Sequence, residues 1–259
     1  MKDTPVTRWA NALTLWGIPP DILAQAPESP WIHPVSSFRP EGDLFVNTPS
    51  RHRALEALPT NGSVLDVGCG GGRGAFGLVP PAGNIVGVDH QSKMLEVFTS
   101  EAAQRSVTCT TVLGDWPDVA ESTPVCDVVI CHHVYYNVAN IEPFARALHD
   151  HATQRVVVEL PMHHPLSSLS PMWKHFWNID RPTSPTAHDA LEAMKHLGFN
   201  AQLETFVVDS DQVTVSDELV QHTRIRLCLP SDRDDEIREY LLTHAPEPRQ
   251  LATIWWDTH

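Results

Sequence analysis

Residues 63–92 constrain the fold of this chain more than any other stretch. A short apolar run, 64–67, is followed by a glycine-rich segment, 68–72, and then by a helical pattern that two prolines and a glycine end. A second apolar run, 85–88, ends in Asp89. Strand, glycine loop, helix and strand in this order, over about 30 residues, predict a βαβ unit.

The layout of this unit also predicts a type of ligand. Glycines at a strand-to-helix turn let ligand atoms approach the bare backbone. The N-terminus of the following helix offers free N–H groups and a positive dipole end to an anionic group. Asp89, roughly 20 residues further on, can accept hydrogen bonds from ribose hydroxyls. We therefore expect a nucleoside-containing ligand with one anionic group near the glycines.

The rest of the chain continues the alternation of strands and helices. Apolar or alternating runs predict further strands over residues 106–113, 126–134, 155–160, 200–208 and 251–257. Helical spacing lies between several of them, over residues 91–104, 140–152 and 186–197. This order predicts an α/β fold with a doubly wound, mostly parallel sheet and helices on both faces. In such sheets ligands bind beyond the carboxyl ends of the strands.

Two segments lie outside this alternation. Residues 1–50 predict a helical and irregular N-terminal appendage, which either lies over the ligand site or packs on the side of the domain. Residues 51–259 then form the ligand-binding domain. Within it, the Pro-, Ser- and aromatic-rich connection 162–185 is too long for an idle loop, so we expect a lid or a wall of the substrate site there.

The composition of the chain limits the kinds of partner that the protein is expected to bind. The net charge is −14, with 32 acidic against 18 basic residues, and an acidic surface repels nucleic-acid backbones. Five cysteines without CxxC spacing predict reduced thiols in a cytoplasmic protein. No apolar run approaches the length of a membrane span, and the N-terminus has no export signal. We expect neither nucleic acid nor membrane as a partner, and a monomer or homodimer.

The segment 66–72, reading DVGCGGG, together with Asp89 and Asp115, resembles the first motifs of class I S-adenosylmethionine (SAM) methyltransferases. The resemblance implies a seven-stranded Rossmann-like sheet. It also implies that the first acid and the glycines hold the methionine part of SAM, that Asp89 holds the ribose and that Asp115 holds the adenine beside Trp116. The end of the fourth-strand segment, residues 127–138, would run past the sulfonium of SAM. The cofactor-binding residues implied are Asp66, Gly68, Cys69, Gly70, Gly72, Asp89, His90, Gly114, Asp115, Trp116, Cys131 and His132.

A methyltransferase gains much of its acceleration from orienting donor and acceptor and excluding water, so a base is needed only where the acceptor must lose a proton. Histidine suits that role near neutral pH. The candidates are His133, Tyr136 and His163, each of which could instead serve packing or solvation. A metal site built from Glu159 and neighbouring histidines is not expected, because their spacing matches no helical metal-binding pattern.

The resemblance implies a SAM-dependent methyltransferase that acts on O or N of a small-molecule acceptor and releases S-adenosylhomocysteine. The chain lacks the Asn-Pro-Pro-aromatic motif that base and glutamine methylation of one type would require. Two alternatives stay open. One is an NAD(P)-binding oxidoreductase that uses the GxGxxG match at 72–77, although this match begins several residues after the strand. The other is a SAM-binding protein without catalytic activity.

Overall fold

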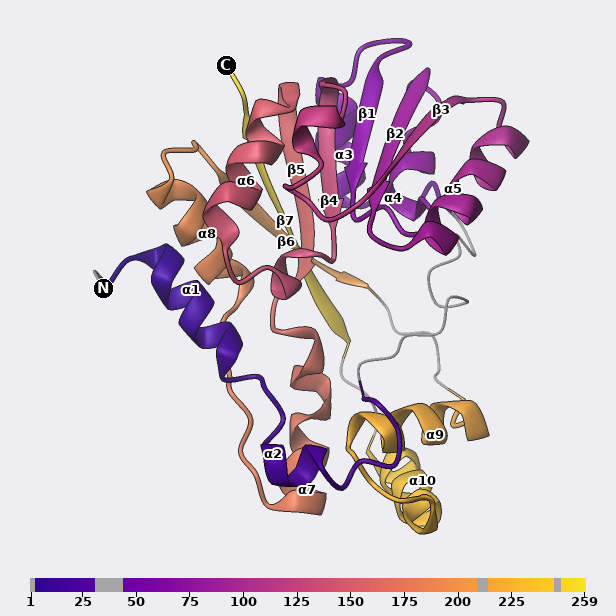
Figure 1. Cartoon of the computed structure of the whole chain (residues 1–259), viewed down its shortest axis with the longest axis vertical. Coiled ribbons are helices and arrows are strands. Elements are labelled where there is room, and N and C mark those ends of the chain that lie inside the picture. The colour runs from indigo at the N-terminus through magenta and orange to yellow at the C-terminus, as the bar shows by residue number, and fades with distance from the viewer. Residues whose placement is uncertain (1–2, 31–43, 209–213, 245–247) are drawn as a thin grey trace.

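A computed structural model describes residues 3–30, 44–208, 214–244 and 248–259, and its centre is a seven-stranded sheet (Figure 1). The strand order is β3-β2-β1-β4-β5-β7-β6, and β7 runs antiparallel to both of its neighbours while the other strands are parallel. This confirms the predicted doubly wound, mostly parallel sheet. The strands are β1 (Ser63–Val67), β2 (Asn84–Asp89), β3 (Thr108–Leu113), β4 (Cys126–His132), β5 (Ala152–Pro161), β6 (Gln202–Val208) and β7 (Arg249–Asp257).

Helices cover both faces of the sheet, and each face has its own apolar core. One core joins the sheet to α1 (Pro5–Thr14), α6 (Ile141–Asp150) and α8 (Ala187–His196). The other joins it to α3 (Pro49–Ala57), α4 (Arg73–Phe76) and α5 (Ser92–Gln104). Because β1, β2, β4 and β5 are buried on both faces, their sequences read as nearly continuous apolar runs.

The helix after the glycine loop is much shorter than its sequence pattern predicts. The α4 helix has four residues, and its C-cap is Gly77. Gly74 lies inside it, and glycine is a poor helix former because its backbone loses the most conformational freedom. The helix that was expected to run up to the prolines is therefore a single turn, which provides little dipole.

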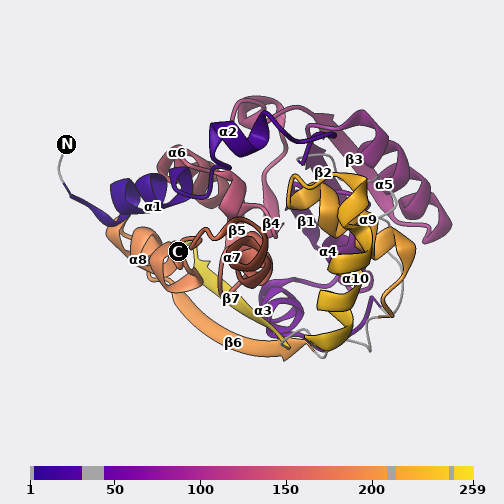
Figure 2. The same ribbon diagram turned by 90° about the horizontal axis from the view of Figure 1, so that it is seen from below.

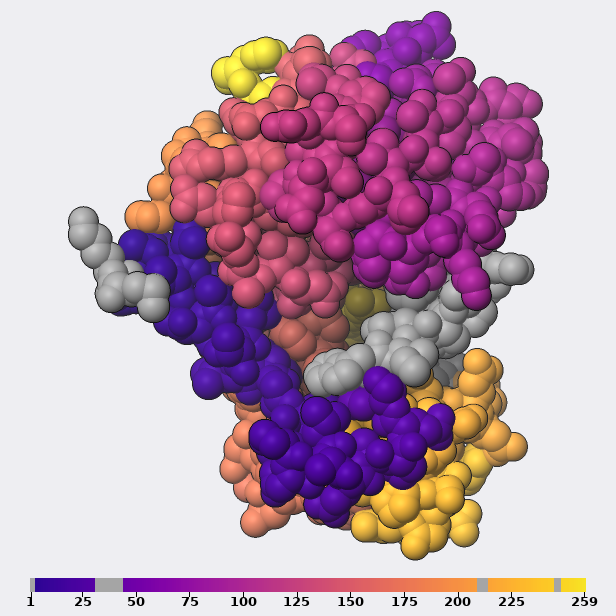
Figure 3. Space-filling view, in the orientation of Figure 1, coloured from indigo at the N-terminus to yellow at the C-terminus, as the bar shows by residue number. Residues whose placement is uncertain are grey.

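A third apolar cluster lies apart from the sheet, beyond the carboxyl ends of its strands. It unites α2 (Pro20–Leu23), α7 (Ser170–Trp177), α9 (Asp217–Arg226) and α10 (Asp234–Thr243) with the short 3-10 turn η4 (Pro165–Leu169) (Figures 1 and 2). We call this group of elements the cap. In the space-filling view it forms a separate lobe below the sheet body (Figure 3). Its buried members are Ile18, Ile22, Met172, Trp173, Val220, Leu227, Cys228, Leu229 and Ile237.

The N-terminal segment contributes to both the sheet body and the cap. The α1 helix packs on the side of the sheet body, where the fully buried Trp9 donates a hydrogen bond to the carbonyl of Val138 at 2.8 Å and stacks on Tyr136. Residues 18–30 continue into the cap. Part of the expected N-terminal appendage, residues 31–43, lies outside the described residues. None of the helices in the described part of the chain has the length and apolar character needed to cross a membrane.

Replacing Trp9 by alanine should remove the contact that fixes α1 to the sheet body. We expect Trp9→Ala to lower the free energy of unfolding by about 3–5 kcal/mol, as for other buried aromatic residues. The exposed Leu15, one residue beyond α1, gives the matched control, and Leu15→Ala should change it by less than about 0.5 kcal/mol. Urea unfolding monitored by circular dichroism measures both values. Equal effects of the two substitutions would show that α1 is not anchored through Trp9.

Candidate functional site

The loop between β1 and α4 can be built only with glycine at two of its turns. Gly68 and Gly72 have φ of 73° and 90°, in the left-handed region. A Cβ atom at Gly68 would lie 2.4 Å from a methyl group of Val134, and one at Gly72 would lie 2.2 Å from the ring of Phe76. The backbone of Gly68 is nevertheless exposed on its outer side, so the loop offers bare main chain to a ligand.

Asp89 ties this loop to the end of the next strand. Its carboxylate accepts hydrogen bonds from the backbone N–H of Gly70 at 3.0 Å and of Gln91 at 2.9 Å. The side chain is only 8% exposed, and His90 beside it is exposed, with Nδ1 at 3.9 Å from the carboxylate. Because a carboxylate has about four acceptor positions, Asp89 can still accept bonds from two hydroxyl groups.

Asp66 lies below the loop inside β1 and is almost completely buried. Burial raises its pKa to about 7; the N–H of Ala75 acts in the opposite direction, and the charge of Asp89 adds to the increase. The two carboxyl groups are therefore close enough to repel each other, as expected for neighbouring strand ends.

The end of β3 reaches the same edge. The N–H of Gly114 donates to the backbone carbonyl of Asp89 at 3.0 Å, which places the exposed Asp115 directly after that contact. Trp116 is half buried; its indole N–H donates to the carbonyl of Phe144 at 3.3 Å. This bond fixes the indole against α6. An open groove begins beside these residues and is lined by Ser92, Leu95, Glu96, Thr99, Ser100, Thr111 and Leu113.

A second polar group lies at the carboxyl ends of β4 and β5. The backbone register pairs His132 with Glu159 and Glu159 with Thr253. The Glu159 carboxylate accepts a 2.5 Å hydrogen bond from Ser50, whose hydroxyl lies 2.6 Å from that of Thr253. Burial acts to raise the pKa of Glu159, but the two neighbouring histidines and Ser50 lower it to about 2. Glu159 is thus ionised at neutral pH.

His133 completes this group. Its positive φ of 62° turns the chain at the end of β4, and its Nε2 atom lies 3.2 Å from the Glu159 carboxylate. A carboxylate at that distance favours the tautomer with the proton on Nε2, which leaves Nδ1 as a proton acceptor. The side chain is 42% exposed. A half-exposed imidazole oriented by a buried carboxylate has the arrangement of a general base.

The neighbouring residue, His132, has one ring nitrogen in an unusual environment. Its Nε2 atom is buried and has no hydrogen-bond partner among the described residues, while its ring lies on Gly74, where a Cβ atom would be 2.9 Å from Nδ1. Burial lowers the pKa of His132. Buried polar atoms without partners are rare in folded proteins, so this nitrogen marks a position for a polar group of a ligand or a water molecule.

Comparisons with known proteins agree with this arrangement. A family model described as "Methyltransferase domain" matches residues 64–154, about a third of the chain. That range contains the glycine loop, Asp66, Asp89, Asp115 and His133. Over these residues the chain is similar to a methyltransferase domain.

The chain also resembles two curated proteins in sequence and a solved structure in fold. The chain is 30% identical over 120 residues to ubiquinone biosynthesis O-methyltransferase of Rickettsia akari, which is 46% of each protein, and 29% identical over 100 residues to that of Agrobacterium fabrum. It therefore spans about half the length or less of the curated relatives it matches. The YcgJ protein of Bacillus subtilis has the same fold, with a TM-score of 0.54 at 17% identity over 80% of this chain and 97% of that one.

Two of the predicted site residues need correction. Tyr136 donates its hydroxyl to the carbonyls of Pro161 at 2.9 Å and Met162 at 3.3 Å, and burial raises its pKa, so it is not available as a base. Cys131 is fully buried in the core on the α6 side of the sheet and cannot touch a ligand. The indole N–H of Trp116 is bonded to α6, and the position of its ring beside the adenine stays a prediction.

The other predicted residues lie at or near the edge of the sheet. Cys69 is buried within the loop, and burial raises the pKa of its thiol. His163 is exposed and pairs through its backbone with Thr186. Within the described ranges, no cluster of three or more His, Cys, Asp or Glu side chains is arranged to hold a metal ion.

The roles of Ser50 and Glu159 were missed by sequence reasoning. Glu159 is an acid near the end of an otherwise apolar strand, which is a detectable signal for a site residue. Ser50 gives no such signal, because it lies on α3, more than 100 positions from its partner, and only the packing of that helix brings the two together.

The raised pKa of Asp66 predicts a pH-dependent stability. The folded state favours the neutral form, so this contribution is complete below about pH 4 and is lost as the pH rises to about 7. Asp66→Asn should therefore gain stability relative to the native protein between pH 4 and 7. Each tenfold difference in proton affinity corresponds to about 1.4 kcal/mol, so the gain should reach a few kcal/mol near pH 7. Urea unfolding across this pH range measures the difference. The exposed Asp150→Asn is the control, and a pH-independent difference for Asp66→Asn would contradict the prediction.

Proposed function

We propose that this protein transfers a methyl group from SAM to an oxygen atom of a small-molecule acceptor. The observation that carries the proposal is the position of the Glu159–His133 pair, one strand away from the glycine loop and Asp89 on the same edge of a class I methyltransferase fold. A donor site and a candidate base thus lie on adjacent strand ends.

The glycine loop fits SAM. The loop shows bare backbone at Gly68, where a side chain would collide with Val134, and this suits the methionine part of the cofactor. Asp89 keeps acceptor positions for the two ribose hydroxyls, and Asp115 at the next strand end suits the adenine amino group. When bound, SAM supplies an electrophilic methyl group on a positively charged sulfur.

His133 would receive the proton that an acceptor hydroxyl loses. Glu159 holds the opposite side of the ring, so Nδ1 is presented as the accepting atom, and the ionised carboxylate stabilises the imidazolium that forms. The names of the curated relatives, both O-methyltransferases, favour oxygen over nitrogen as the accepting atom.

The net charge favours a small molecule as the methyl acceptor, and the state of the cysteines favours the cytoplasm as the location of the protein. The net charge of −14 works against nucleic-acid binding. All five cysteines are free, and four of them are buried, which suits a reducing compartment.

Binding of S-adenosylhomocysteine tests the donor site. Asp89→Ala should weaken it at least tenfold in isothermal titration calorimetry, because a hydrogen bond to a charged acceptor contributes about 1.5–3 kcal/mol. The exposed Asp150→Ala should bind like the native protein. Binding of NADH in place of S-adenosylhomocysteine, or unchanged affinity in Asp89→Ala, would contradict the proposed site.

The role of His133 as a base is tested by assaying methyl transfer to a panel of phenols and catechols. The assay measures the S-adenosylhomocysteine that is released. His133→Gln should lower kcat by about 100-fold or more at pH 7, since general-base catalysis contributes about 10²–10⁴-fold. Raising the pH should recover part of the loss, because the acceptor hydroxyl then ionises without help. Glu159→Gln should show a smaller loss of the same kind.

The exposed His52→Gln is the matched control and should keep the native rate. Native activity in His133→Gln at pH 7 would reject the base while leaving the donor site intact.

A further inference from the structure

Two buried hydroxyl groups lie in a row behind the carboxylate of Glu159. Ser50, in the first turn of α3, has its Oγ atom 2.5 Å from Oε2 of Glu159. The hydroxyl of Thr253, on β7, lies 2.6 Å from that of Ser50. Both hydroxyl residues are fully buried, and Glu159 is only 8% exposed. We call the hydroxyls of Thr253 and Ser50, in this order, the hydroxyl row; it leads to a carboxylate that water hardly reaches.

The protons of the hydroxyl row have one possible order. A hydroxyl group has a single proton to donate. Because Glu159 is ionised, its Oε2 atom can only accept, so Ser50 gives its proton to the carboxylate. Thr253 must then donate its own proton to the oxygen of Ser50. Hydrogen bonds in such a chain polarise one another, which strengthens the bond that reaches the carboxylate.

The two oxygen atoms of Glu159 have different partners. Oε2 accepts from Ser50, whereas Oε1 lies 3.2 Å from Nε2 of His133. The backbone N–H of His133 also donates to the backbone carbonyl of Glu159 at 2.7 Å, so main chain and side chain both hold the two residues together. Because the negative charge is shared between the two oxygens, a donor on Oε2 weakens the attraction of Oε1 for a proton on the imidazole.

This attraction matters because a base must be unprotonated before it can accept a proton. A buried carboxylate with an imidazole as its main partner favours the protonated imidazole, since the two then form an ion pair. The hydroxyl row works against this, because it stabilises the charge of Glu159 without adding a proton to His133. The N-terminus of α3 acts in the same direction: Ser50 is the second residue of this helix, where the dipole favours a negative charge.

The other titratable groups around His133 do not replace this effect. Among the described residues, the carboxylate within ion-pair distance of His133 is that of Glu159. The adjacent His132 interacts electrostatically with both residues. Burial lowers the pKa of His132, although Glu159 acts in the opposite direction, so its ring is neutral at pH 7.

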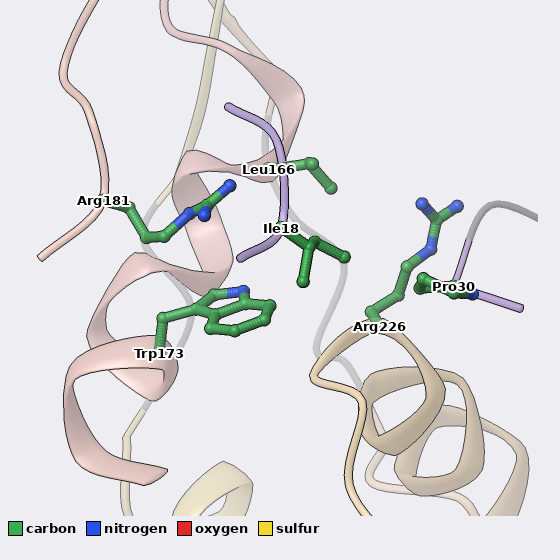
Figure 4. A pocket seen from close by; sticks show the side chains of 6 residues that line it. All are labelled: Ile18, Pro30, Leu166, Trp173, Arg181 and Arg226. Atoms are coloured by element: carbon green, nitrogen blue, oxygen red, sulfur yellow. The ribbon is translucent and has the colours of Figure 1, made fainter. Parts of the chain in front are cut away.

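The charge that the cap carries at Arg181 acts on a different histidine. Burial and the charge of Arg181 lower the pKa of His164 to about 4. Arg181 itself lies near Trp173 at a pocket of about 10 Å³, which has room for about one water molecule (Figure 4). The protonation of His133 is therefore governed by Glu159 and the partners of its carboxylate.

We propose that Ser50 and Thr253 are positioning residues that keep the imidazole of His133 unprotonated at neutral pH by sharing the negative charge of Glu159. The inference rests on the proposed function for the role of His133 as a base. The effect of the hydroxyl row on the imidazole does not depend on that function. Neither hydroxyl would touch the cofactor or the acceptor, since both are fully buried.

Titration of the His133 ring, followed by nuclear magnetic resonance without cofactor or acceptor, tests the proposal. The signal that disappears in His133→Gln identifies the ring. Ser50→Ala removes the donor on Oε2, so the midpoint of the titration should move up by about 0.5–1 pH unit. Thr253→Val should move it up by less, because it removes only the polarising bond. Glu159→Gln should move it down, because no negative charge then holds the proton.

The exposed Ser122→Ala makes the same change away from the hydroxyl row and should titrate like the native protein. A midpoint that is unchanged or lower in Ser50→Ala would overturn the proposal, and so would an unchanged midpoint in Glu159→Gln. If Ser50→Ala does not fold, Thr253→Val decides alone, since valine has nearly the shape of threonine. An unchanged midpoint in that variant would then contradict the role of the hydroxyl row.

The methyl-transfer assay gives a second measurement and separates this proposal from the proposed function. A higher midpoint keeps the imidazole protonated to a higher pH, so Ser50→Ala should lose kcat by about 3–10-fold on the acid side of the midpoint. The loss should disappear at about pH 9. An equal loss at every pH would indicate a merely structural role and contradict the proposal. Absence of methyl transfer in the native protein would reject the proposed function and leave the result of the ring titration standing.

Discussion

The ends of β1, β2 and β3 form the edge of the sheet that carries the glycine loop. The organisation of this edge depends on the hydrogen bond from the backbone N–H of Gly70 to the carboxylate of Asp89. It joins the loop after β1 to the end of β2, and the backbone of Asp89 receives a further bond from Gly114 at the end of β3. Three consecutive strand ends are thereby held together by one residue. The glycine conformations at Gly68 and Gly72 are the local requirement for this closure, because side chains there would collide with Val134 and Phe76.

The other half of the edge is organised by a buried negative charge. Glu159 accepts a hydrogen bond from Ser50 of α3 and lies 3.2 Å from His133, just after β4, so it can remain ionised inside the protein and orient His133. The proposed donor site and the candidate base therefore lie on neighbouring strand ends, an arrangement that suits a bound cofactor meeting an acceptor.

Much of the sheet could be predicted from the sequence, because strands buried on both faces leave continuous apolar runs and each strand end carries a distinctive residue. The same reasoning overestimated the length of α4, because hydrophobic periodicity takes no account of the free-energy cost of Gly74 within a helix. It also could not place Tyr136, whose hydroxyl is taken by carbonyl groups on β5 and just beyond it, or Cys131, whose face of the sheet depends on register. The cap was predicted only in part, because its core unites segments far apart in the chain and such packing leaves no local signal.

The most direct test of this account is a crystal structure of the protein with S-adenosylhomocysteine. The account predicts the ribose hydroxyls on the Asp89 carboxylate, the amino acid part along the backbone of Gly68, and the sulfur facing the space beside His133. S-adenosylhomocysteine bound elsewhere, or bound with His133 on the far side of the strand edge from the sulfur, would contradict it.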